Sequence, residues 1–164
     1  MRLDNRRVYL LLGSNLGERK VLIEEAIVRI SHLVGEVFAR SSVYETAAWG
    51  KEDQPSFLNV ALGIISPLDP LDILQKVLQI EQELGRVRGE RWGARLIDID
   101  VILIDDLVVN EPHVLQIPHP EMQNRKFVLE PLAEIAPDHL HPVIKRTVAE
   151  LLQTLQDNLG VSKI

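Results

Sequence analysis

The alternation of hydrophobic and polar positions divides the first part of the chain into a strand, a helix and a second strand. Residues 8–13 are almost wholly apolar and predict a buried strand, which a glycine-containing turn connects to a helix. The helix is predicted from Glu18 to a stop at Gly35, and residues 36–46, rich in β-branched and aromatic residues, predict a strand. A loop follows over residues 47–56. The apolar positions at helical spacing are Ile23, Ala26, Ile27, Ile30, Leu33 and Val34.

A second helix carries an apolar stripe at the same spacing. Asp69 and Pro70 predict its start, as the cap and the first helical residue, and Gly85 predicts its end. We expect the stripe to pack against the sheet that the strands form. Its members are Ile73, Val77, Ile80 and Leu84.

Two later strands separate their side chains into an apolar face and a mixed face. Successive side chains of a strand point to opposite faces, so Asp98 and Asp100 lie together on one face of the later strand. Phe57 and Asn59 lie on the mixed face of the earlier strand, and all four residues share a cleft if the two strands are near one another. The apolar faces, expected in the core, are Leu58, Val60, Leu62 and Ile64 within residues 57–65, and Ile97, Ile99, Val101 and Leu103 within residues 96–104.

The order strand, helix, strand, strand, helix, strand predicts an α+β fold with a mainly antiparallel sheet and helices on one face. Asp105 and Asp106 predict a tight turn into a short strand over residues 107–109. Proline-punctuated loops, a short helix and a final helix over about residues 145–158 follow. The length of 164 residues suits a single domain, with its core over about residues 8–142.

Composition excludes several classes of protein. The hydrophobic share of 46% suits a globular core, and no apolar run approaches the ~20 residues that cross a bilayer. The first residues lead into a strand without the apolar segment of a signal peptide, and cysteine is absent. These features favour a cytoplasmic location and no membrane partner. A net charge of −6 argues against nucleic acid as a partner.

Asp98 and Asp100 are candidate magnesium ligands. On one strand face their backbones are about 7 Å apart, and apolar residues flank both. Two carboxylates so placed repel each other unless a cation neutralises them; the alternative is a solvated strand face. Magnesium suits an oxygen-only pair, because it keeps water and phosphate oxygens as further ligands.

The segment before these aspartates predicts contact with phosphate. Residues 85–95 contain four arginines, three glycines and no lysine, against the acidic balance of the whole chain. Arginine binds phosphate oxygens in pairs, and the glycines give the mobility of a lid; the alternative is an ordinary solvated loop. Trp92 is either an apolar anchor for this loop or a wall against a nucleotide base. The arginines are Arg86, Arg88, Arg91 and Arg95.

Aromatic, amide and histidine side chains give weaker signals. Phe57 and Asn59 suit a flat heteroaromatic ligand, by stacking and by amide hydrogen bonds, although ordinary sheet packing explains them as well. His119 lies between two prolines and precedes Arg125 and Phe127. The alternatives for this group are a second cluster on the phosphate side and a structural role.

Five segments point to one enzyme family. They are GSNLG (13–17), YET (44–46), DQPSFLN (53–59), GRVRGERWGARLIDID (85–100) and IPHPEMQNRKFVLEPL (117–132). With them the chain resembles 6-hydroxymethyl-7,8-dihydropterin pyrophosphokinase of folate biosynthesis, over about residues 8–142. The resemblance implies a ferredoxin-like βαββαβ fold and a diphosphotransferase. Its partners would be ATP and 6-hydroxymethyl-7,8-dihydropterin, and pyrophosphate would pass from ATP to the hydroxymethyl oxygen with release of AMP.

Carried over residue by residue, the resemblance implies three groups of site residues. Asp98 and Asp100 would bind two Mg²⁺ ions together with ATP, and Arg86 and Arg95 would stabilise charge on the phosphate chain during transfer. The ATP-binding residues would be Glu81, Arg88, Trp92, His119 and Arg125. The pterin-binding residues, with the ring between the two phenylalanines, would be Thr46, Trp49, Phe57, Asn59 and Phe127.

Two other functions remain open from the residues themselves. A palm-type nucleotidyltransferase also uses paired strand aspartates and two metals, but it releases pyrophosphate instead of AMP. A non-catalytic nucleotide-sensing domain would bind ATP without consuming it, and it gives no reason for Phe57, Asn59 and Phe127. The sequence does not specify the oligomeric state, for which a monomer or a weak homo-oligomer is expected.

Overall fold

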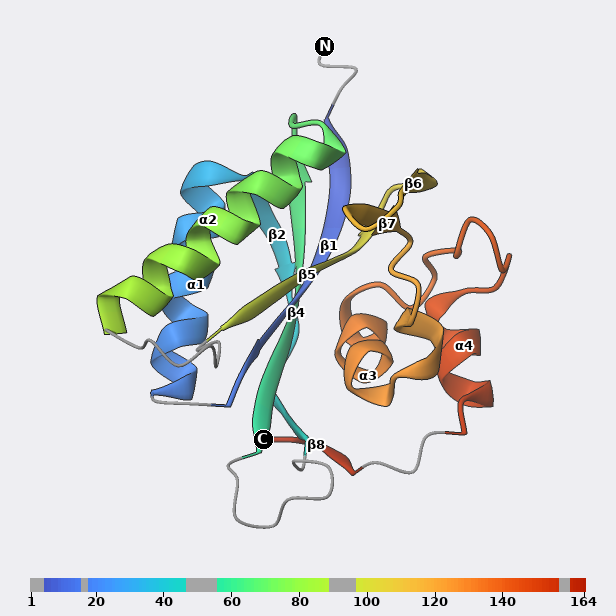
Figure 1. The fold of residues 1–164 in the computed structure, drawn as a ribbon. Coiled ribbons are helices and arrows are strands. Elements are labelled where there is room, and N and C mark those ends of the chain that lie inside the picture. The colour runs from blue at the N-terminus through green and yellow to red at the C-terminus, as the bar shows by residue number, and fades with distance from the viewer. Residues whose placement is uncertain (1–4, 16–17, 47–55, 89–96, 157–159) are drawn as a thin grey trace.

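A computed structural model describes residues 5–15, 18–46, 56–88, 97–156 and 160–164 of the chain. A central antiparallel sheet separates two pairs of helices, with α1 and α2 on one side and α3 and α4 on the other (Figure 1). The elements in chain order are β1 (Arg6–Ser14), α1 (Arg19–Leu33), β2 (Glu36–Arg40), β3 (Tyr44–Thr46), β4 (Phe57–Ser66), α2 (Pro70–Arg88), β5 (Asp98–Ile104), β6 (Val109–Glu111), β7 (Leu115–Ile117), η1 (Met122–Asn124), α3 (Lys126–Ile135), α4 (Val148–Thr154) and β8 (Val161–Lys163).

The sheet has six described strands in the order β5-β1-β4-β3-β8, and β2 also pairs with β4. Every pairing in it is antiparallel, with β1 between β4 and β5. Each helix of the βαββαβ core therefore connects two strands that have a third strand between them, which is the ferredoxin-like arrangement. The predicted α+β fold class is confirmed.

The first hydrophobic core lies between the sheet and helices α1 and α2. The predicted stripe of α2, from Ile73 to Leu84, is fully buried there, as is the apolar face of β4. The prediction that Gly85 ends this helix is wrong, because α2 continues to Arg88. A glycine inside a helix costs only about 1 kcal/mol relative to alanine, and the burial of the apolar stripe outweighs that cost.

A second hydrophobic core, absent from the prediction, lies on the other face of the sheet. Helices α3 and α4 pack there against Tyr9 and Leu11 of β1 and Ala61 of β4. Leu103 belongs to this second core, so its predicted place beside Ile97, Ile99 and Val101 is wrong. The register between β1 and β5 shifts at a bulge between Tyr9 and Leu10, where β5 has one extra residue, and the alternation of faces along β5 changes there.

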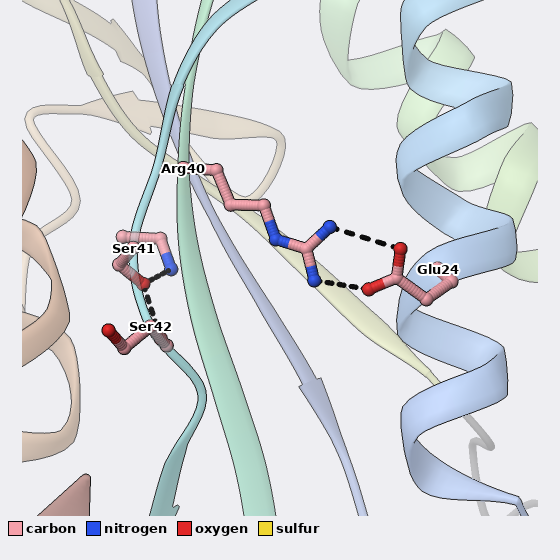
Figure 2. A network of polar contacts seen from close by, with 5 residues as sticks. Glu24, Arg40, Ser41 and Ser42 are labelled. Carbon is pink, nitrogen blue, oxygen red and sulfur yellow. Dashed lines mark hydrogen bonds and ion pairs between the residues drawn. The ribbon is translucent and has the colours of Figure 1, made fainter. Parts of the chain in front are cut away.

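The single strand predicted over residues 36–46 is divided into β2 and β3. At the break, Ser41 Oγ accepts a hydrogen bond from the backbone N of Ala61 at 2.8 Å, in place of a strand carbonyl, and donates to the carbonyl of Ser42. Just before the break, the guanidinium of Arg40 donates two hydrogen bonds to the carboxylate of Glu24 on α1 (Figure 2). This bidentate ion pair links the end of β2 to the helix layer.

The C-terminal part differs most from the predicted elements. The strand expected over residues 107–109 begins at Val109 as β6, and it pairs with β7 in a separate hairpin. The final helix is also shorter than expected: α4 begins after Thr147, which forms a capping box with Glu150, and ends at Thr154. Strand β8 then pairs with β3 at the edge of the main sheet. No helix in the described ranges is long and apolar enough to cross a membrane.

Candidate active site

Asp98 and Asp100 lie side by side on the sheet face opposite α1 and α2. Their partners in the register of β1 are Gly13 and Leu11, and Leu11 belongs to the second core. Both aspartates are half-buried, whereas Ile99 between them is buried in the first core. The strand thus holds the two carboxylates on one face, as the alternation of the sequence predicts.

The backbone between the two aspartates is tied to helix α2 by a hydrogen bond. The backbone N of Ile99 donates to Oε2 of Glu81 at 2.6 Å. Among the described strands, β5 is the outermost of the main sheet, so a side chain here takes the place of the carbonyl of a further strand. Glu81 is therefore a structural support for the Asp98–Asp100 segment, whatever it contacts in a ligand.

An open groove of about 430 Å³ runs beside the aspartates. One wall is α2, another is the β6–β7 hairpin, and the floor includes Asp100 of β5. The groove combines apolar and polar surface near a carboxylate, which suits a ligand with an aromatic base and a charged chain. Its lining residues include Leu74, Leu78, Glu81, Leu115, Gln116 and His119.

His119 faces this groove in a defined hydrogen-bonding environment. Its backbone N donates to the carbonyl of Ile102 at 2.9 Å, and its Nδ1 accepts from the backbone N of Glu121 at 3.1 Å. Burial lowers the pKa of His119; Asp100 opposes this and Arg125 reinforces it. With Nδ1 as an acceptor, the ring carries its proton on Nε2 and offers that nitrogen as a donor.

A second candidate ligand site is indicated by buried polar atoms on β3 and β4. Thr46 and Asn59 are 3% and 5% exposed, and within the described part of the chain Thr46 Oγ1 and Asn59 Oδ1 have no hydrogen-bond partner. Buried polar atoms are normally paired, so these two atoms are candidate partners for a polar ligand. Thr46 is directly opposite Phe57 in the pairing of β3 with β4, which brings a half-buried aromatic ring to the same place.

Helix α3 brings Phe127 and Arg125 to this side of the sheet. Arg125 directly precedes the first residue of the helix, and its guanidinium lies 5.8 Å from the ring centre of Phe127. The helix packs on β4 and β3, the strands that carry Asn59 and Thr46. A flat ligand near the two buried polar atoms would therefore have α3 as a neighbour.

The comparisons with known proteins agree on one family. A family model for 7,8-dihydro-6-hydroxymethylpterin-pyrophosphokinase (HPPK) matches residues 9–137. The chain belongs to the HPPK family. It is 42% identical over 159 residues to the 2-amino-4-hydroxy-6-hydroxymethyldihydropteridine pyrophosphokinase of Methylorubrum extorquens, with 96% of this chain and 98% of that protein covered. It is 44% identical over 132 residues to the Bacillus subtilis protein of the same name, with 80% and 78% covered.

A solved structure is consistent with this membership. The chain is similar to Plasmodium falciparum HPPK-DHPS, with a TM-score of 0.71 over 91% of this chain and 43% of that chain, at 17% identity. A likeness at that identity shows the fold alone. The reaction follows from the family instead: the chain is an ATP-dependent pyrophosphokinase of folate biosynthesis that acts on hydroxymethyldihydropterin.

Several residues predicted to act in this HPPK cannot be placed. Trp49, Trp92 and Arg95 lie outside the described residues. Arg86 and Arg88 lie in the last turn of α2, not in a loop as predicted, and only their backbone is described. Within the described ranges, no group of three histidine, aspartate or glutamate side chains could hold a metal ion. Asp98 and Asp100 stay predicted magnesium ligands, and such a pair would need water or phosphate oxygens as further ligands.

Some residues that line the groove were not predicted from the sequence. Leu74, Leu78 and the hairpin residues Leu115 and Gln116 line the groove, yet none of them was predicted as a site residue. The available signal was a turn at Pro112 between two short strand-like segments, which predicts a hairpin but not its position against α2. Gly13 was predicted as the last residue of a strand and the first of a turn, and nothing in the sequence indicated that β1 would place it between Asp98 and Asn59.

Proposed function

We propose that this HPPK carries out its transfer across the face of β5, β1 and β4, with a metal site at Asp98 and Asp100 and a pterin site at Asn59. The supporting observation is that three residues of neighbouring strands are paired in one line across the sheet. Gly13 of β1 is directly paired with Asp98 on one side and with Asn59 on the other. Two strand spacings, about 10 Å, separate the backbones of Asp98 and Asn59. The phosphate chain of ATP spans that interval, so donor and acceptor meet over β1.

The groove beside Asp100 is the proposed nucleotide site. Leu74, Leu78 and Leu115 offer an apolar wall for the adenine base, and His119 offers its Nε2 proton to a phosphate oxygen. Glu81 lines the same groove while it holds the backbone of Ile99. The further ATP contacts proposed from the family resemblance are Arg88, Trp92 and Arg125.

The second candidate ligand site, at Thr46 and Asn59, is the proposed pterin site. Hydroxymethyldihydropterin carries an amino group and ring N–H groups that donate hydrogen bonds, and Asn59 Oδ1 is a buried acceptor without a described partner. The hydroxyl of Thr46 can donate or accept at the same edge. Phe57 and Phe127 would hold the two faces of the ring, and Trp49 would line the site.

The proposed chemistry is an in-line displacement at the β-phosphorus of ATP. The hydroxymethyl oxygen loses its proton to the surrounding water and forms a bond to that phosphorus, the bond to the oxygen of the α-phosphate breaks, and AMP leaves. Asp98 and Asp100 would hold two Mg²⁺ ions, which when bound neutralise the phosphate chain and orient it. Arg86 and Arg95 would stabilise the charge that develops during transfer. The chain's own part is therefore to position the reactants and to supply fixed charge.

Asp100→Asn tests the metal site. The amide keeps the size of the side chain but loses its charge, so AMP formation from ATP, Mg²⁺ and the pterin should fall on the order of 100-fold or more. Asp106→Asn is the matched control, because Asp106 is an exposed turn residue away from the groove. Thermal unfolding of both variants should resemble the wild type. A near-normal rate in Asp100→Asn would remove the metal assignment.

Product analysis of the wild type tests the reaction itself. Incubation with ATP, Mg²⁺ and hydroxymethyldihydropterin should yield AMP and the pyrophosphorylated pterin. Release of free pyrophosphate would instead indicate nucleotidyl transfer, and ATP binding without turnover would indicate a sensing domain. Family membership favours the first result over both alternatives.

A further inference from the structure

Gly13 lies where a side chain would collide with the amide of Asn59. A methyl group placed on Gly13 would be 2.7 Å from Nδ2 of Asn59, a separation that carbon and nitrogen atoms do not adopt without a shift. The next nearest atoms are the carbonyl oxygen of Leu58 at 3.8 Å and Cγ of Asn59 at 3.9 Å. The amide end of Asn59 is therefore the close contact at this position, and the backbone around it leaves room.

Backbone conformation does not explain this glycine. Gly13 is a regular residue of β1, paired on both sides, and it does not have the positive φ that favours glycine. Gly35 shows the contrast, because a methyl group there would be 2.3 Å from the backbone oxygen of Ile65. Gly35 is required by the backbone, whereas Gly13 makes room for one side chain.

The side chain that uses this room is the amide proposed to bind the pterin. Asn59 is 5% exposed, so its carboxamide is confined between its neighbours. One end of the amide lies over Gly13, and the other end, Oδ1, is buried without a hydrogen-bond partner among the described residues. A rotation that relieved a collision at Nδ2 would also move Oδ1, since both atoms belong to one planar group.

We propose that Gly13 is a positioning residue for pterin binding: the lack of a Cβ lets the carboxamide of Asn59 lie across β1 with Oδ1 held towards the pterin donors. The inference rests on the proposed pterin site. A misplaced acceptor leaves buried donors of the ligand unpaired, which reduces affinity by about tenfold to a hundredfold. The ATP groove, lined by α2, β5 and the hairpin, does not depend on this contact.

Gly13→Ala is the direct test, with binding measured on the full chain. The dissociation constant for hydroxymethyldihydropterin should rise at least about tenfold, while that for ATP stays within about twofold of the wild type. Gly63→Ala is the matched control: it adds a methyl group to the same face of the sheet, 2.8 Å from the Phe38 ring. The same methyl group would lie 3.2 Å from the ring of Tyr9, and Gly63 is paired with Tyr9 instead of with Asn59, so pterin affinity should not change.

A double-mutant cycle with Asn59→Ala shows whether Gly13 acts through the amide. In the Asn59→Ala background, Gly13→Ala should cause no further loss of pterin affinity, because the group it displaces is gone. An equal loss in both backgrounds would overturn the positioning role. If Gly13→Ala is too unstable for a binding assay, the free energy of unfolding is measured instead. The double variant should then be as stable as Asn59→Ala. A double variant as unstable as Gly13→Ala would overturn the inference.

Pterin binding by the wild-type protein distinguishes a failure of this inference from a failure of the proposed function. A wild-type protein that does not bind the pterin would refute the pterin site and the inference with it. A wild-type protein that binds the pterin, together with a Gly13→Ala variant that binds it equally well, would refute the inference alone.

Discussion

Replacement of Glu81 by alanine should weaken the edge of the sheet that carries the proposed metal site. The change removes the carboxylate oxygen that accepts from the backbone N of Ile99 at 2.6 Å. Ile99 is only 4% exposed, so water does not readily replace that acceptor. An unpaired buried amide costs about 1–3 kcal/mol. We therefore expect Glu81→Ala to lower the free energy of unfolding by about 2 kcal/mol.

Thermal unfolding gives the first measurement. For a domain of this size, 2 kcal/mol corresponds to a fall in Tm of about 4–8 °C. Glu81→Gln keeps an oxygen acceptor but loses its charge, and its Tm should fall by about half as much. Glu83→Ala is the matched control on the same helix, because it loses a partly exposed ion pair with Arg29, worth less than about 1 kcal/mol.

The magnesium dependence of turnover gives the second measurement. Asp98 and Asp100 flank Ile99, so loss of its hydrogen bond should loosen both carboxylates and raise the Mg²⁺ concentration needed for half-maximal activity. Pterin affinity should stay unchanged, since β4 and β3 are not affected. The reasoning is refuted if Glu81→Ala is as stable as Glu83→Ala, or if the Mg²⁺ requirement does not move while ATP affinity alone falls.

Three further predictions concern stability. Leu84→Ala, at a position 0% exposed on α2, should lower the free energy of unfolding in denaturant by about 3 kcal/mol, whereas Leu78→Ala, 47% exposed, should cost less than 1 kcal/mol. Burial alone would raise the pKa of Glu134, but hydrogen bonds, foremost from Tyr44, outweigh it and lower the pKa below the usual 4.5. The stabilisation from the Glu134 carboxylate is then present above pH 4.5 and lost as the pH falls through the lowered pKa. The difference in the free energy of unfolding between the wild type and Glu134→Gln should therefore shrink in that range. A constant difference would contradict the hydrogen bonds to Glu134. Arg40→Ala breaks an exposed ion pair with α1 and should lower Tm by no more than about 4 °C; a larger fall would show that the pair is coupled to the break between β2 and β3.

Residues that obey one local period were predicted well. The stripe of α2 and the apolar faces of β4 and β5 were assigned to a core from spacing alone, and all but Leu103 lie in the first core. Leu103 was misassigned because the bulge in the pairing of β1 with β5 is set by the partner strand. Gly85 was taken as a stop because glycine often ends helices, but the packing of α2 on the sheet carries the helix past it.

Contacts between distant segments decided what the local pattern could not. The second core depends on α3 and α4 returning to the far face of the sheet, and nothing in the spacing of their own residues specifies that surface. The groove likewise requires α2 to stand against a hairpin that begins more than twenty residues later in the chain. The bond from Ile99 to Glu81 requires an edge strand to meet a helix, which is a property of the assembled sheet.

The sequence by itself determined the α+β class, the side-by-side placement of Asp98 and Asp100 and the HPPK resemblance, because each depends on residue types at short, regular spacing. Only the tertiary structure decided what stands beside those residues. Gly13 is the clearest case: the sequence predicts it at the junction of a strand and a turn, and in the fold it is paired with Asp98 and Asn59 at once. Strand register creates that neighbourhood, and β1, β4 and β5 are so far apart in the chain that the sheet must assemble before the register between them is set.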